Sequence, residues 1–157
     1  MNATTRVIAT FYEAFGRGDP DTMAKCYHPD VVFSDPIFPE LRGVQVMEMW
    51  RMLLERSAGI EVVASCLDGD DRCGQAHCAV RYTSRRTGRA MDNEIDAGFR
   101  FADGMIIEHK DHFDFWHWSR QALGMPGLLL GWTPSLQRKV QTAAVAGLVT
   151  FMGRWPS

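Results

Sequence analysis

Residues 89–116 decide the fold and read RAMDNEIDAGFRFADGMIIEHKDHFDFW. Asp103-Gly104, a dipeptide typical of a tight hairpin turn, separates two runs in which apolar and polar residues alternate. Upstream, Asp68-Gly69-Asp70 and Thr87-Gly88 separate further β-prone runs in the same way. Three successive hairpin turns predict an antiparallel meander of four strands, over residues 60–67, 72–85, 89–101 and 105–116.

Helical patterns dominate the first third of the chain. Apolar residues from Val7 to Phe15 recur at helical spacing, and Asp19-Pro20 then begins a second short helix with Tyr27 on its inner face. A short β-prone run follows at residues 31–33, and a third helix follows Gly43. Helices before strands favour an α+β fold, in which the helices cover one face of a curved sheet.

The C-terminal part departs from this order. We expect an apolar loop over residues 124–132 and an extra C-terminal helix over residues 134–152, polar in its first half and apolar in its second. The chain would then be one domain over residues 1–123, with residues 124–157 packed on the same domain or on a partner subunit. Binding to a membrane surface is the less favoured alternative, and the apolar stretch is too short to span a bilayer.

Composition and charge exclude several classes of protein. The chain has 157 residues, of which 46% are hydrophobic and 23% charged, as in one ordinary globular domain. Its formal charge of −2 gives no strong field for nucleic acid or an anionic membrane. Four cysteines without a C-x-x-C pair, and an N-terminus without an apolar signal core, predict free thiols and a cytoplasmic location.

Three motifs carry a resemblance to a known family. They are residues 11–19, FYEAFGRGD; residues 33–36, FSDP, followed by Gly43; and residues 103–114, DGMIIEHKDHFD. Their order and spacing resemble the SnoaL-like, or nuclear transport factor 2-like, superfamily, with its ketosteroid isomerase-like and limonene epoxide hydrolase-like members. The resemblance covers residues 3–123 and implies a cone of curved sheet and helices around one apolar pocket. It specifies no reaction, because isomerases, epoxide hydrolases, cyclases, dehydratases and non-catalytic binders share this fold.

Strand alternation indicates which side chains face the pocket, because residues two apart lie on one face of a sheet. On the last strand we expect Met105, Ile107, His109, Asp111 and Phe113 to face inward. The earlier strands and the helices would add further inward residues, so that the proposed ligand-binding set is Tyr12, Phe15, Tyr27, Trp50, Cys78, Val80, Tyr82, Asn93, Ile95, Ala97 and Phe113.

The candidate catalytic residues are Asp35, Asp111 and His109. A carboxylate in an apolar pocket has its pKa raised by desolvation and becomes a better base near neutral pH, where imidazole also exchanges protons. The resemblance places Asp35 where isomerase-like members carry their general base, and Asp111 where hydrolase-like members keep a catalytic carboxylate. The structural alternatives are that Asp35 caps the loop after its strand, and that Asp111 and His109 form a buried structural pair.

The chain departs from both groups of relatives. The inward Arg and Asp that hydrolase-like members carry on the second strand are matched by Cys78 and Val80, which argues against epoxide hydrolysis. Tyr12 is one residue away from the position of the isomerase tyrosine. The third-strand aspartate position is Ala97, and only a one-residue bulge near Gly98 would turn Asp96 inward. A metal site of His109, Asp111 and His112 is not expected, because His112 opposes the other two.

The favoured function is therefore a cofactor-free acid–base enzyme of isomerase, cyclase or dehydratase type that uses a buried aspartate on a small apolar molecule. The alternative is a non-catalytic module that binds a hydrophobic ligand or another protein. A homodimer is expected in either case, because the outer sheet face and the apolar C-terminal part need cover. No nucleic-acid partner and no metal are expected.

Overall fold

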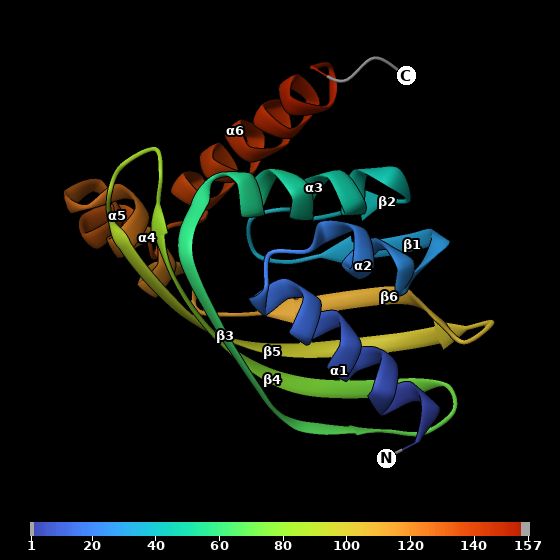
Figure 1. Cartoon of the computed structure of the whole chain (residues 1–157). Coiled ribbons are helices and arrows are strands. Elements are labelled where there is room, and N and C mark those ends of the chain that lie inside the picture. The colour runs from blue at the N-terminus through green and yellow to red at the C-terminus, as the bar shows by residue number, and fades with distance from the viewer. Residues whose placement is uncertain (1, 155–157) are drawn as a thin grey trace.

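The computed structural model describes residues 2–154. Within that range the chain forms six helices and six strands (Figure 1). The helices are α1 (Ala3–Gly16), α2 (Pro20–Lys25), α3 (Val44–Glu55), α4 (Phe115–Leu123), α5 (Met125–Leu130) and α6 (Pro134–Met152). The strands are β1 (Tyr27–Ser34), β2 (Leu41–Arg42), β3 (Ser57–Gly69), β4 (Cys73–Ser84), β5 (Ala90–Ala102) and β6 (Met105–His112).

One curved sheet contains all of these strands in the order β2-β1-β6-β5-β4-β3. Strands β3 to β6 form the predicted antiparallel meander, whereas β1 joins its edge parallel to β6. The sheet curls around α1, and α3 lies across the open side of the curve (Figure 1). The turn between β5 and β6 has positive φ angles at Asp103 and Gly104, 56° and 75°, as a tight hairpin of this kind requires. The α+β prediction is therefore confirmed.

Several element boundaries differ from the sequence predictions. Tyr27 begins strand β1 and is not part of the preceding helix, which ends at Lys25. The two-residue strand β2 carried no recognisable signal. The expected loop over residues 124–132 contains a short helix, α5, which packs on α4 through two glycines. A Cβ atom at Gly127 or Gly131 would collide with Ser119 of α4, so only glycine at these positions allows the close approach.

A β-bulge in β6 corrects the predicted inner face of that strand. Arg100 pairs with Glu108, but the next residue of β5, Phe101, pairs with Ile106, so β6 carries one extra residue at Ile107. Alternation is therefore reset in the middle of the strand. Ile106 is fully buried, whereas Met105 and Ile107, which were predicted to face inward, are only half-buried. After the bulge His109 and Asp111 are both buried, as alternation predicted.

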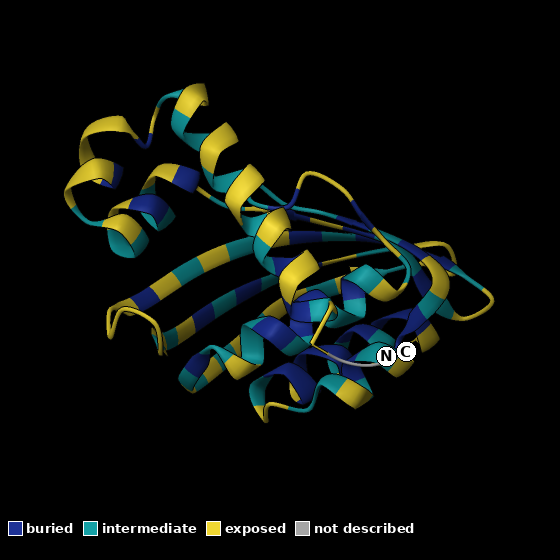
Figure 2. Ribbon diagram, turned by 90° about the horizontal axis from the view of Figure 1, so that it is seen from above, coloured by how far each residue is buried: buried dark blue, intermediate teal, exposed yellow. Residues whose placement is uncertain are grey.

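The core lies between the concave face of the sheet and the helices. Its fully buried side chains come from nearly every element and include Ile8, Phe11, Phe33, Met49, Ile106 and His109. Figure 2 shows buried residues on the strands and on the sides of the helices that face them. The polar His109 among these apolar side chains is the first indication of a built site.

The C-terminal helix α6 packs on α3 in the same chain. The side-chain amides of Gln137 and Gln141 donate to the carbonyl of Pro36, at 3.1 and 3.2 Å, and Leu148 and Phe151 are buried. The outward side of α6 is exposed (Figure 2). Within residues 2–154, none of the helices is both long and apolar enough to cross a membrane.

Candidate active site

A chain of four polar side chains runs through the core. The indole Nε1 of Trp50 donates to the phenol oxygen of Tyr27 at 2.9 Å, and that oxygen lies 2.8 Å from Nδ1 of His109. On the other side of the imidazole, Nε2 of His109 lies 2.8 Å from Oδ1 of Asp111. All four residues are buried. Because buried polar groups without partners are costly, the complete pairing explains how this chain is tolerated in an apolar core.

The donors and acceptors assign the protons of this chain. Indole nitrogen can only donate, so the Tyr27 oxygen accepts from Trp50 and its own proton is available to Nδ1 of His109. A neutral imidazole that accepts at Nδ1 carries its proton on Nε2 and donates it to the Asp111 carboxylate. Burial, and next the Asp111 charge, raise the pKa of Tyr27 well above its usual value, so this phenol keeps its proton. The chain thus holds the Asp111 carboxylate in one orientation.

Aromatic rings enclose the imidazole of His109. The ring of Phe99 lies 4.4 Å from it between centroids, those of Phe33 and Phe11 lie at 5.1 and 5.5 Å, and Trp50 stacks on it at 6.3 Å. Such a wall excludes water and strengthens the electrostatic interactions inside it. His109 is therefore a buried group that orients its neighbours.

Tyr12 is buried within electrostatic reach of Asp111. Burial is the largest cause that raises the pKa of Tyr12 well above its usual value, and the charge of Asp111 is the next, followed by Cys78. The three side chains therefore share one region, formed by α1, β4 and β6. Among residues 2–154, no group pairs with the Tyr12 phenol by a hydrogen bond. This neutral phenol is a donor available to a ligand.

Asp35 follows β1 and combines the two roles that its sequence position left open. Its Oδ1 accepts from the backbone N–H groups of Ile37 and Phe38, at 2.7 and 2.6 Å, and so caps the loop. Burial nevertheless raises the pKa of Asp35 to about 7, against the lowering effect of the Phe38 hydrogen bond, and the negative charge of Asp111 raises it further. Protonated and ionised forms of Asp35 are thus both populated at neutral pH, and its interaction with Asp111 links the two carboxyl groups electrostatically.

The remaining predicted ligand-binding residues fall into two groups. Cys78, Val80 and Ala97 are buried on the inner face, as are Tyr12, Phe15, Tyr27 and Trp50 from the other elements. Tyr82, Asn93 and Ile95 share that face but are half-buried, and so is Phe113, which lies beyond the end of β6. Tyr27 and Trp50 are hydrogen-bonded within the buried chain of polar groups, and their contact with a ligand stays a prediction.

Asp96 lies on the opposite face of the sheet. The β4–β5 ladder has no register shift, so the bulge that would turn Asp96 inward is absent from it. The Asp96 side chain is 82% exposed and lies 2.9 Å from Nδ1 of His77. His112 is exposed as well. Within residues 2–154, no group of three or more His, Cys, Asp or Glu side chains has the arrangement of a metal site.

An apolar cleft of about 280 Å³ lies between α3, the β4–β5 hairpin and α4. Phe38, whose backbone holds the Asp35 carboxylate, lines it, and Tyr82 continues the inner face of β4 into it. The other lining side chains include Met49, Leu53, Arg56, Arg86, Met91 and Trp118. Of these, Met91 follows from extending the alternation of Asn93 and Ile95 by one step. The paired ends of the β3–β4 hairpin bring Arg56 and Arg86 together, whereas Trp118 comes from α4.

Comparison with known proteins agrees with this architecture. Residues 8–109 match the model of the SnoaL-like domain family. No curated protein matches the chain.

Solved structures show the same fold at low identity. An LEH-like epoxide hydrolase from M. tuberculosis is 20% identical, with a TM-score of 0.66 over 82% of this chain and 96% of that one. An NTF2-like protein of unknown function from Burkholderia pseudomallei is 19% identical, with a TM-score of 0.68 over 78% and 99%. A protein with a ketosteroid isomerase-like fold from Catenulispora acidiphila is 13% identical, with a TM-score of 0.67 over 82% and 97%. The chain belongs to the SnoaL-like domain family and has its NTF2-like α+β fold.

Proposed function

We propose that this protein is an acid–base enzyme that moves a proton on a small, largely apolar molecule, in a reaction of the isomerase, cyclase or dehydratase type. The single observation that carries the proposal is the partly buried Asp35, whose pKa is raised to about 7 and whose carboxylate accepts from the backbone of Phe38, a residue that lines the apolar cleft. A group that titrates near the working pH is suited both to remove and to return a proton. The SnoaL-like family and its hydrolase and isomerase-like structural relatives fit an enzyme.

The neighbouring groups have complementary roles in this proposal. Asp35 as carboxylate removes a proton from a carbon next to a carbonyl group, and as carboxylic acid returns it to another carbon. The neutral phenol of Tyr12 donates a hydrogen bond to the oxygen on which negative charge develops. Burial is the main cause that raises the pKa of Asp35, and Asp111, held by His109, raises it further. Tyr27, Trp50 and His109 are positioning residues.

The test uses two isosteric variants and a matched control. Asp35→Asn and Asp111→Asn retain the side-chain shape and an acceptor oxygen but remove the charge, and are assayed on ketone, epoxide and polyketide-like substrates. Loss of a general base is expected to lower kcat by at least about 100-fold for Asp35→Asn. Asp71→Asn, which replaces an exposed carboxylate in the turn between β3 and β4, is the control and should leave kcat unchanged. An activity that survives both Asp35→Asn and Asp111→Asn contradicts the proposal.

A second candidate function is a non-catalytic module that binds a hydrophobic ligand or a protein. It is favoured by the apolar side chains that α5 and its flanks expose, of which Trp132 is 72% and Met125 64% exposed. Native mass spectrometry distinguishes the two functions, because a ligand retained without turnover supports binding. The same surface supports a homodimer, which a monomeric mass in light scattering at micromolar concentration would contradict.

We infer a cytoplasmic location for the protein from its exposed thiols. Cys66 and Cys73 are exposed free cysteines, and such side chains suit a reducing, cytoplasmic environment.

A further inference from the structure

Two arginines border the apolar cleft without an acidic partner. Arg56 caps the C-terminal end of α3, and Arg86 lies in the turn between β4 and β5. Both line the cleft together with Met52, Leu53 and Trp118. Among residues 2–154, no carboxylate forms an ion pair with either guanidinium, and neither makes a side-chain hydrogen bond.

The surroundings of Arg56 are positive. Burial is the largest cause that lowers the pKa of Arg56, and the charge of Arg86 is the next. Glu55 acts in the opposite direction, but it lies 3.7 Å from Arg154, whose charge also lowers the pKa of Arg56. Two like charges held together at an apolar surface favour an anion between them, because the anion would relieve the repulsion and the partial desolvation.

The rest of the cleft indicates what that anion is attached to. Met49, Met52, Leu53, Met91 and Leu123 present hydrocarbon and thioether surface, and Ser57, Ser84 and Thr87 add hydroxyl-bearing residues near the arginines. Apolar walls with a few converging polar groups are typical of sites for small organic molecules. At about 280 Å³ the cleft suits a molecule of modest size.

We propose that the cleft binds an apolar molecule that carries a carboxylate, with the carboxylate between Arg56 and Arg86 and the apolar body directed along Phe38 toward Asp35. The planar guanidinium groups match a carboxylate geometrically and bind it through paired hydrogen bonds. The orientation of the apolar body toward Asp35 rests on the proposed acid–base function. The inference adds the substrate class, an apolar carboxylic acid, and a pair of residues that would select it.

The experiment compares two probes of equal chain length, octanoate and 1-octanol, by isothermal titration calorimetry at pH 7.5. Octanoate should bind wild-type protein about tenfold more tightly than octanol, since hydrogen bonds to charged groups contribute that much. Higher salt should reduce the difference. Arg56→Gln and Arg86→Gln should each weaken octanoate binding and leave octanol binding unchanged. Arg72→Gln, in the exposed turn between β3 and β4, is the matched control and should change neither.

Arg86 lies in an exposed turn, so its variant tests the site even if Arg56→Gln disturbs the end of α3. Equal affinity for octanoate and octanol, absence of octanoate binding at millimolar concentration, or octanoate affinity unaffected by both substitutions would each overturn the inference. None of these results involves turnover. Conversely, if the Asp35→Asn and Asp111→Asn variants remain active, the acid–base proposal fails, whereas the selective binding of carboxylates is unaffected.

Discussion

The chain contains histidine–aspartate pairs in two different settings. In the core, Nε2 of His109 lies 2.8 Å from Asp111, and the two side chains are 1% and 6% exposed. Near the start of β5, Nε2 of His117 lies 2.7 Å from Asp92, and the two side chains are 38% and 56% exposed. The distances are nearly the same, so the difference between the pairs lies in burial and in their other partners.

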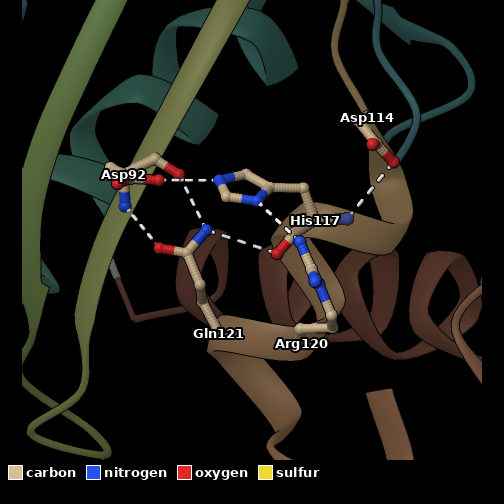
Figure 3. Close-up of polar contacts among 5 residues, drawn as sticks. All are labelled: Asp92, Asp114, His117, Arg120 and Gln121. Atoms are coloured by element: carbon tan, nitrogen blue, oxygen red, sulfur yellow. Dashed lines mark hydrogen bonds and ion pairs between the residues drawn. The ribbon is translucent and has the colours of Figure 1, made fainter. Parts of the chain in front are cut away.

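The exposed pair fastens a helix to the sheet. His117 and Gln121 belong to α4, and the Gln121 amide accepts from the backbone N–H of Asp92 and donates to its carbonyl (Figure 3). Gln121 thereby takes the place of β6, whose pairing with β5 ends at His112. Arg120 lies 3.1 Å from the other nitrogen of His117. Water competes for each of these groups, whereas nothing in the core replaces the partners of His109.

The largest expected effect is the loss of stability when His109 is replaced, compared with the loss when His117 is replaced. His109→Leu leaves the Asp111 carboxylate buried without its donor and removes the acceptor of Tyr27, so we expect a loss of about 3–5 kcal/mol in unfolding free energy. His117→Leu exposes its former partners to water, and we expect a loss below about 1 kcal/mol. Urea denaturation of both variants measures the difference. Equal losses would show that burial does not distinguish the pairs.

The second prediction concerns pH and Asp35. Its pKa is raised to about 7 in the folded protein, whereas an unfolded aspartate titrates near its usual value of 3.8. The folded state therefore binds more protons than the unfolded state between about pH 4 and pH 7, and stability falls as the pH rises through this window. A shift of about 3 pH units corresponds to at most about 4 kcal/mol, since each unit is about 1.4 kcal/mol.

Asp35→Asn should remove that slope while retaining the oxygen that accepts from Ile37 and Phe38. Urea unfolding at a series of pH values should therefore show wild type losing stability relative to Asp35→Asn from pH 4 to pH 7, with a constant difference above pH 7. A difference that grows in the opposite direction would mean that the carboxylate is stabilised in the folded state.

Sequence patterns predict the inner face well where the strands are regular. In β4 and β5 the alternation holds without a register shift, so Cys78, Val80 and Ala97 lie where the pattern placed them. In β6 two adjacent isoleucines hide the bulge at Ile107, because either could occupy the core. Alternation alone cannot locate a bulge between two equally apolar residues.

The buried chain of polar groups was only partly predictable for a related reason. His109 and Asp111 share a strand, so their pairing follows from local spacing. Trp50 and Tyr27 reach them from α3 and β1, and their hydrogen bonds depend on how the helix crosses the sheet. The meeting of Arg56 and Arg86 follows from the pairing of β3 with β4, in which Ser57 pairs with Ser84 and the N–H of Arg85 donates to the carbonyl of Arg56. Two register shifts in that hairpin mean that counting residues from its turn does not locate the pair.

The smallest expected effect belongs to a third pair, His77 and Asp96, on the outer face of the sheet. The hydrogen bond that the His77 imidazole donates to the Asp96 carboxylate is the largest cause that raises the pKa of His77, and Glu94 at 3.6 Å contributes less. The stabilising effect of the His77–Asp96 pair is present below the ordinary pKa of histidine and is lost as the pH rises through the raised pKa of His77. Because both side chains are largely in water, the change in unfolding free energy should be too small for denaturation to detect.

Nuclear magnetic resonance can observe this pair where denaturation cannot. The midpoint of the His77 imidazole titration should lie above 6.5 in wild type, fall toward 6.5 in Asp96→Asn, and fall by less in Glu94→Gln. Asp92→Asn, which removes the partner of His117, is the control and should leave the His77 midpoint unchanged. If the His77 midpoint is unchanged in Asp96→Asn, the hydrogen bond between His77 and Asp96 is not maintained in solution. Exposure to water would then abolish the His77–Asp96 hydrogen bond, although its length is close to that of the buried His109–Asp111 hydrogen bond.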